Sequence, residues 1–98
     1  MMLREQGDTT DRLRRALLEF RAAQNLLLAA NRRLKGLPAE EIEAFWLTPG
    51  GRIERHVQAA AAEVVAAFKA FSATGLVAEV GDRHLVTEAE RCLADGEA

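Results

Sequence analysis

The sequence is poor in the residues that carry most covalent and metal chemistry. Among its 98 residues there is one cysteine, Cys92, one serine, Ser72, and no tyrosine. A single cysteine excludes an internal disulfide and a thiolate metal cluster. The two histidines, His56 and His84, are separated by most of a predicted helix, and no nucleophile, base and orienting acid stand together. We therefore expect a non-enzymatic protein with no metal and no cofactor.

Long apolar runs are also missing. The most apolar stretch, residues 57–73, is interrupted by Glu63 and Lys69 and is short for a membrane-spanning helix. Residues 1–8 have no apolar core of the kind found in signal peptides. Together with the lone cysteine, these features lead us to expect a cytoplasmic protein without membrane contact.

The composition is that of a folded domain, with 49% hydrophobic and 29% charged residues. One domain over 1–98 is the natural prediction. The formal charge of −2 is unevenly spread, because basic residues dominate 1–36 and acidic residues dominate 37–98. This asymmetry favours a nucleic-acid-binding face on the first helix or head-to-tail self-association. Two solvated faces without a partner are the alternative.

Capping residues, glycines and prolines divide the chain into mostly helical elements. Gly36 and Gly75 stand where helix-terminating residues are expected, and Pro38 prevents continuation of the first helix. The expected elements are a flexible lead over 1–8, a helix over 9–36, a short helix over 38–47, a helix over 50–74, a β-hairpin over 76–87 and a short helix over 88–94. The predicted fold class is mainly α: a long helical hairpin with a short helix between its arms, then a small wing-like β-hairpin and a short C-terminal helix.

The two long predicted helices carry matching heptads, in which large residues recur every seven positions with a companion row that is mostly alanine. In the first helix these are Leu13, Phe20, Leu27 and Leu34, with Ala16, Ala23 and Ala30. In the third helix they are Val57, Val64 and Phe71, with Ile53, Ala60 and Ala67. Large side chains of one helix can fill the space above alanines of the other, so we predict an antiparallel helical hairpin.

The third helix is apolar on more than one side, because Val65 and Phe68 lie off its heptad. A helix that is apolar all round must be covered all round, and soluble monomers rarely expose such a patch. We therefore predict a homo-oligomer, a dimer or a ring. The expected interface residues are Val57, Ala60, Ala61, Val64, Val65, Phe68 and Phe71. The alternative is that alanine is a strong helix former that tolerates exposure.

After the third helix the hydrophobic period changes. Residues 76–80 and 83–86 are apolar and β-branched enough for two strands, and 81–82 is a credible two-residue hairpin loop. Thr87 and Glu90 have the spacing of a capping box, which predicts that the last short helix starts there.

Residues 75–91 resemble the end of a winged-helix domain, in which a glycine and two apolar residues close the recognition helix and a hairpin with a Gly-Asp-Arg-like tip forms the wing. The resemblance implies that Arg83 and His84 stand at the wing tip, where a basic side chain meets a phosphate. Upstream, residues 59–73 depart from the family, because they hold only three polar residues with which to read bases. The resemblance therefore implies backbone contact with DNA.

The basic residues of the first helix lie off its heptad and point outward, which is the geometry of phosphate contacts. The predicted nucleic-acid-binding residues are Arg12, Arg14, Arg15, Arg21, Arg32, Arg33, Lys35, Arg83 and His84. The leading hypothesis is a small, oligomeric, winged-helix-like regulator or adaptor that contacts the backbone of double-stranded DNA. The alternative is a protein-binding accessory factor of phage or plasmid type without enzymatic activity: an inhibitor, or an assembly or DNA-packaging adaptor such as a small terminase-like ring subunit.

Overall fold

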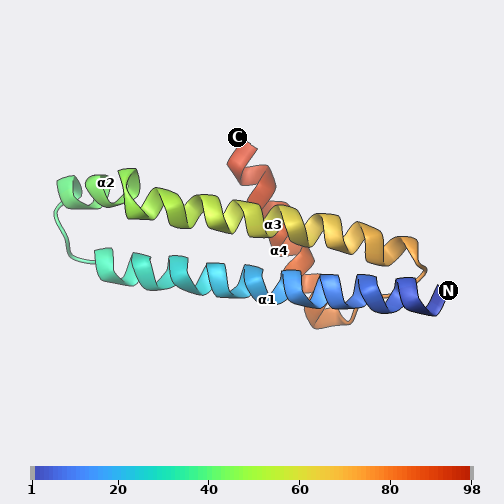
Figure 1. The fold of residues 1–98 in the computed structure, drawn as a ribbon. Helices are drawn as coiled ribbons and strands as arrows, with labels where there is room; N and C mark the ends of the chain where they lie inside the picture. The colour runs from blue at the N-terminus through green and yellow to red at the C-terminus, as the bar shows by residue number, and fades with distance from the viewer. Residues whose placement is uncertain (1, 98) are drawn as a thin grey trace.

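Four helices form the chain in the computed structural model, which describes the backbone of residues 2–97 and the side chains of residues 6–96. The helices are α1 (Met2–Leu34), α2 (Ala39–Leu47), α3 (Pro49–Ala73) and α4 (Val80–Glu97). The molecule measures 57 × 23 × 21 Å. In Figure 1, α1 and α3 run antiparallel along its length, α2 lies at their joined end, and α4 crosses them obliquely. The predicted helical class and the long helical hairpin are confirmed.

The hairpin core contains few large side chains among many alanines. Phe20 and Val64 are 0% exposed, and Ala23, Ala61 and Ala67 around them are equally inaccessible. Because alanine occupies one heptad row on each arm, the helix axes can approach closely and the larger row fills the remaining space. The packing of the core therefore follows directly from the heptads in the sequence.

Glycines in the left-handed region end both long helices. Gly36 follows α1 with φ +84°, and Gly75 follows α3 with φ +86°, a conformation in which a Cβ would be strained. Pro38 then caps α2, and Glu40 and Glu41 lie in its first turn, where the helix dipole favours acidic side chains. These signals set the sharp reversal between the arms.

Gly50, a buried glycine of α3, allows α2 to pack closely against α3. A Cβ at Gly50 would overlap the Trp46 ring and would lie 2.7 Å from Cε1 of Phe45. We expect Gly50→Ala to lower the free energy of unfolding by about 1–3 kcal/mol through overpacking, which outweighs the gain in helix propensity of about 1 kcal/mol. Since Trp46 is the only tryptophan, its fluorescence during urea denaturation reports α2 directly.

The matched control is Gly7→Ala, also in a helix, where an added Cβ meets nothing within 4 Å. That variant should be neutral or slightly more stable. Equal behaviour of the two variants would show that the close approach at Gly50 does not hold α2 in place.

The predicted β-hairpin over 76–87 and the short helix over 88–94 are wrong. Residues 2–97 contain no strand: residues 76–79, called the strap below, have no regular secondary structure, and α4 begins at Val80. Asp82 lies in the first turn of α4, where a carboxylate is favoured. The Thr87 hydroxyl donates to the Arg83 carbonyl oxygen at 3.1 Å, as mid-helix threonines do, so Thr87 does not cap a new helix. The winged-helix resemblance fails with the missing wing.

Helix α1 begins at Met2, so residues 2–8, expected to form a flexible lead, are helical. Thr9 and Thr10, which resemble helix caps in the sequence, both donate to the Gln6 carbonyl oxygen, at 3.1 and 2.6 Å. The Gln6 side-chain amide donates to the Thr74 carbonyl oxygen at 3.2 Å. This contact ties the first turns of α1 to the end of α3.

Helix α4 covers the side of α3 that the hairpin leaves open. Its residues Val86 and Ala89 are 1% and 0% exposed and belong to the same core cluster as the hairpin residues. Val65 and Phe68 of α3 pack partly buried against that cluster. The all-round apolar character of α3 is therefore satisfied largely within one chain.

None of the helices that the structure describes has the length and apolarity needed to cross a membrane.

Candidate functional site

A groove runs along α1 on the side where α4 crosses the hairpin. It consists of three adjoining hollows of about 260, 320 and 610 Å³, and neighbouring hollows share wall residues. We call this feature the α1–α4 groove. Its α1 wall extends from Thr10 to Leu28, a helix length of about 27 Å. Its other wall is formed by the strap and the first half of α4.

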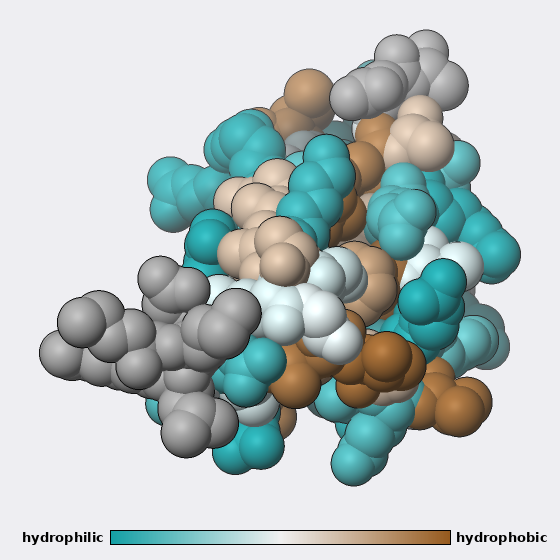
Figure 2. All heavy atoms as spheres, turned by 90° about the vertical axis from the view of Figure 1, so that its right-hand side faces the viewer, coloured by the Kyte–Doolittle hydropathy of each residue, from teal (hydrophilic) through white to brown (hydrophobic). Residues whose placement is uncertain are grey.

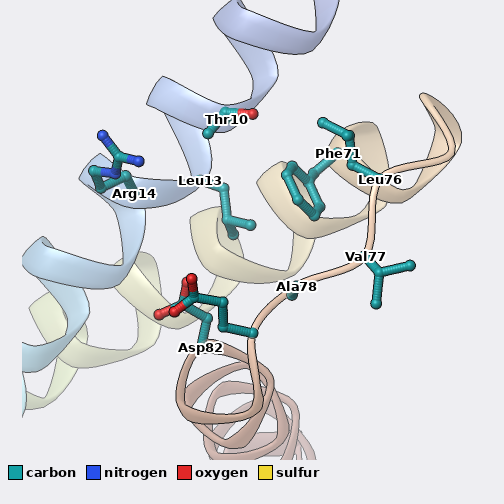
Figure 3. Close-up of a pocket in the computed structure, with 9 residues that line it drawn as sticks. Thr10, Leu13, Arg14, Phe71, Leu76, Val77, Ala78 and Asp82 are labelled. Carbon is teal, nitrogen blue, oxygen red and sulfur yellow. The ribbon is translucent and has the colours of Figure 1, made fainter.

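The strap closes one end of the groove. In Figure 3, Leu13 from α1 and Phe71 from α3 point into the hollow beneath the strap, while Val77 points away from it. Asp82, at the start of α4, lies on the side of the hollow nearest α1. The turn at Gly75 sends the strap back across the end of α3 toward α1. The glycine conformation therefore positions the second wall of the groove.

The floor and rims of the groove carry leucines. Leu17 is buried and Leu85 is partly buried, whereas Leu18 and Leu28 are 65% and 55% exposed. At the strap end, Val77 and Val80 are 87% and 88% exposed. Figure 2, which views the molecule from this end, shows apolar side chains gathered at the surface between hydrophilic ones.

Charges of opposite sign face each other across the groove. Arg14 and Arg21 stand on the α1 wall, and Glu79, Asp82 and Glu88 stand on the other. Among the described residues neither arginine has an ion-pair partner within 4 Å. Their guanidinium groups therefore remain open to a carboxylate from outside the chain.

A polar bridge crosses the middle of the groove. The side-chain amide of Gln24 donates to Oε2 of Glu88 at 3.4 Å. His84 Nε2 lies 3.3 Å from Oε1 of the same carboxylate, one helical turn away. This places His84 on α4 beside Glu88, and it is not at the tip of a wing.

The structure disperses the predicted nucleic-acid-binding residues. Arg12 pairs with Glu63, its Nε 2.7 Å and its Nη2 3.3 Å from the two carboxylate oxygens. That hydrogen bond holds the pKa of Glu63 below its ordinary value and raises the pKa of Arg12. The Arg83 guanidinium lies 6.0 Å from the centroid of the Phe68 ring, within cation–π range.

The remaining predicted residues share an exposed position on α1 or just after its end. They are Arg14, Arg15, Arg21, Arg32, Arg33 and Lys35. Acidic side chains are interleaved with them: Asp11 and Glu19 are exposed on the same helix, and the acidic wall of α4 faces Arg14 and Arg21. Over the side chains that the structure describes, the surface of α1 therefore alternates in sign and forms no uniform basic stripe.

The residues predicted for an oligomer interface lie inside the chain. Val57, Ala60, Ala61, Val64 and Phe71 are at most 7% exposed. Val65 and Phe68 are partly buried against the same core. These residues of α3 are therefore covered within one chain and do not need a second subunit. Any contact between copies must use other residues.

Metal-binding residue types are dispersed among the described side chains. No group of three or more histidine, cysteine or acidic residues that could hold a metal is found among them. Burial raises the pKa of the Cys92 thiol, and the nearby Asp95 carboxylate adds to the shift. The side-chain amide of Gln58 lies 3.5 Å from Cys92 Sγ and 3.1 Å from the Cys92 carbonyl oxygen, so Cys92 helps to pack α4 on α3.

Comparison with protein-family models, with curated proteins and with solved structures gives no match. The chemistry of the α1–α4 groove therefore rests on its own residues.

Proposed function

We propose that this protein is a non-enzymatic binding module that holds an amphipathic helix of a partner protein in the α1–α4 groove. One observation carries the proposal: exposed leucines lie in a groove between an arginine wall and an acidic wall. Helix-in-groove recognition uses this combination, in which apolar anchors supply affinity and flanking charges set orientation.

The length of the α1 wall suits a helix, which would lie over the Gln24–Glu88 hydrogen bond that joins the two walls. The α1 wall of about 27 Å matches a ligand helix of about 18 residues, or five turns. Apolar ligand residues spaced three and four apart would lie against Leu17, Leu18 and Leu85. Leu28, exposed at the far end of the groove, would meet the last of them.

The walls define the charge of the partner helix. Acidic residues along one edge would face Arg14 and Arg21 on α1. Basic residues along the other edge would face Glu79, Asp82 and Glu88. A helix with both edges is therefore favoured over a uniformly acidic or basic one, because either of those would meet like charge on one wall.

The mixed charge also favours a protein partner over DNA. Duplex binding needs several phosphates neutralised along a continuous basic surface. Here Arg12 is held by Glu63 at 2.7 Å, and the arginines of the groove look toward carboxylates that would repel phosphate. Exposed Arg32, Arg33 and Lys35 form a short basic segment, but Glu40, Glu41 and Glu43 follow it directly in α2.

The proposal can be tested with a designed peptide of about 18 residues, with leucines on one helical face, glutamates along one edge and lysines along the other. We expect the full chain to bind it, and amide chemical-shift changes to concentrate on residues of the α1–α4 groove. Leu18→Glu should weaken binding about tenfold or more, because it places a charge at the apolar contact. Fluorescence anisotropy of the labelled peptide measures the affinity.

Two controls sharpen the test. Leu26→Glu alters another exposed leucine of α1, 53% exposed and outside the lining of the groove, and should leave the affinity unchanged. A scrambled peptide of the same composition, whose leucines share no face, should not bind. Shifts that map elsewhere, or equal loss in both variants, would contradict the proposal. If the chain instead binds random duplex DNA in a salt-sensitive way and does not bind the peptide, the helix-binding proposal is wrong. The hypothesis of contact with the DNA backbone would then take its place.

A further inference from the structure

The side of α1 that is turned away from the hairpin has an apolar centre. In Figure 1, α3 runs along one side of α1. On the side away from α3, Leu18 and Leu26 are 65% and 53% exposed, and Ala22, midway between them in the sequence, is also exposed. Residues four apart lie on the same side of a helix, so these three form one apolar row that faces solvent.

Charged residues extend this row toward both ends of α1. The members of the extended row, which we call the outer row, are all exposed and follow one another by three or four residues: Asp11, Arg15, Leu18, Ala22, Leu26, Ala29 and Arg33. Residues eleven apart stay aligned on a nearly straight helix, because eleven residues complete three turns at about 3.67 residues per turn. Asp11 and Arg33 therefore lie on opposite sides of Ala22, each about 16 Å from it.

The outer row is complementary to its own reverse. If two copies of α1 run antiparallel with a two-fold axis at Ala22, each residue faces the one that is equally far from Ala22 on the other copy. Leucines then meet beside the axis and opposite charges meet at both ends, and no like charges face each other within the row. The facing pairs are Leu18 with Leu26, Arg15 with Ala29, and Asp11 with Arg33.

The neighbours of the outer row on one flank are compatible with this pairing. Glu19, which is exposed beside the row, would face the uncharged Asn25 of the other copy. Arg12 is held by Glu63 of its own chain at 2.7 Å. Neither flanking charge therefore meets a like charge at the contact.

The basic residues on the other flank lie toward the α1–α4 groove. Arg14 and Arg21 line the groove, whose opposite wall carries three carboxylates. Arg32 of a second copy would lie on the same flank, level with Arg14. The acidic wall therefore offsets its charge as well.

One chain cannot form the end contacts within itself. Asp11 and Arg33 lie on the continuous helix α1, about 33 Å apart. Among the described residues, neither has an ion-pair partner within 4 Å. Contact between these two residues therefore requires a second copy.

We propose that this protein forms an antiparallel dimer through the outer row of α1, with the two-fold axis at Ala22. The small alanine side chain at the axis lets the two helices approach closely, and Leu18 of each copy packs on Leu26 of the other. Two-fold symmetry forms the contact of Asp11 with Arg33 twice and closes the assembly, because the outer row of each copy is then fully used.

The dimer does not rest on the function proposed for the groove. Leu18 lines the groove as well as belonging to the outer row, whereas the other six members of the row lie outside the groove lining. The two surfaces therefore meet only at Leu18. Leu26→Glu, which should leave peptide binding unchanged, should disrupt the dimer.

Charge reversal within one chain tests the pairing. Asp11→Arg and Arg33→Asp each place like charges at both ends of the contact. We expect wild-type chain to dimerise in sedimentation velocity runs and each single variant to raise the dimer Kd by about tenfold. The double variant, Asp11→Arg with Arg33→Asp, should regain the wild-type Kd because opposite charges meet again. Lys35→Asp, an equal charge change at an exposed residue outside the outer row, is the control and should leave the Kd unchanged.

A cysteine at the axis tests the register. In a Cys92→Ser background, Ala22→Cys should form a disulfide between two chains under mild oxidation, because each thiol then lies beside its own copy. Ala29→Cys, also exposed on the outer row, is the matched control. Its thiol would be about 21 Å from its copy along the paired helices, so it should not form this disulfide.

Wild-type chain that stays monomeric up to about 1 mM overturns the inference. A double charge variant that stays monomeric, or equal crosslinking at positions 22 and 29, also overturns it. Arg33 lies outside the groove lining, so Arg33→Asp chain should still bind the designed peptide. A chain that binds the peptide but does not dimerise leaves the proposed function standing, and a chain that dimerises without binding the peptide leaves the dimer standing.

Discussion

Replacing Phe20 by alanine is expected to lower the free energy of unfolding by about 3–5 kcal/mol. Phe20 is one of the largest fully buried side chains, at 0% exposure. Alanines at positions 23, 61 and 67 belong to the same core cluster, and their short side chains cannot reach into the space that the ring leaves. The cavity therefore persists, and its cost adds to the lost burial.

A small domain is stable by only about 5–15 kcal/mol, so this variant should unfold at markedly lower urea concentration by far-ultraviolet circular dichroism. Leu26→Ala, on the same helix but at a side chain that is 53% exposed, is the control and should cost under about 1 kcal/mol. Similar midpoints for the two variants would show that the hairpin does not depend on the Phe20 contact.

The hairpin could be predicted from sequence because its evidence is periodic and local. Leu13, Phe20, Val64 and Phe71 recur at heptad spacing, and all four are buried. A seven-residue repeat on two segments of similar length leaves little choice about which faces meet. Gly36, followed closely by Pro38, marked the end of the first arm through backbone geometry alone.

Threonines near both ends of the chain favour helix caps by residue type but occupy other positions in the structure. Thr9, Thr10 and Thr87 are of a residue type that favours helix starts, and Thr87 also has capping-box spacing to Glu90, yet each of the three lies inside a helix. Their hydroxyls donate to a carbonyl oxygen three or four residues earlier. A threonine side chain forms either bond with similar ease, so its type alone does not distinguish a cap from a mid-helix position.

The wing prediction failed for a related reason. The segment 76–86 is β-branched around a Gly-Asp pair, which favours a hairpin when the segment is considered alone. In the fold, Val86 instead enters the core at helical spacing from Ala89, and that burial decides the outcome. Propensity for strands is weak enough that tertiary packing overrides it.

The candidate site was predictable only in part. Arg14 and Arg21 were expected at a functional surface from their charge and their position off the heptad, and both line the groove. His84 was expected only from the winged-helix resemblance, which is wrong, and it lines the groove from α4. Leu18 and Leu85, which give the groove its apolar contacts, were missed. Leu18 and Leu85 line the same groove only because α4 crosses α1. No local sequence pattern predicts that tertiary arrangement. Exposed leucines off the heptad of α1 were the one available signal.

Replacing Val86 by aspartate is expected to release α4 from the hairpin. Val86 is 1% exposed and belongs to the buried hydrophobic cluster of the core, so a carboxylate there would be surrounded by apolar side chains. An uncompensated buried charge costs about 3–5 kcal/mol. We expect this cost to exceed the free energy that packs α4 on the hairpin, so that α4 detaches. Hydrogen exchange should show lost protection in α4, and circular dichroism should show reduced helix content.

The matched control is the same change at Val80, on the same helix but 88% exposed, which should leave protection and stability nearly unchanged. The two variants should also differ in binding, because release of α4 removes the acidic wall of the groove. Val86→Asp should therefore abolish binding of the designed peptide, and Val80→Asp should retain most of it. Unchanged binding in the Val86 variant would mean that α4 forms no wall of the site.

Release of α4 should also change the association state. Val65 and Phe68 of α3 pack against the cluster that α4 completes, and a detached α4 leaves them facing water. Soluble chains rarely tolerate such a patch, so Val86→Asp chains should self-associate through α3. A Val86→Asp chain that remains monomeric with α4 unprotected would show that the alanine-rich face of α3 needs no cover.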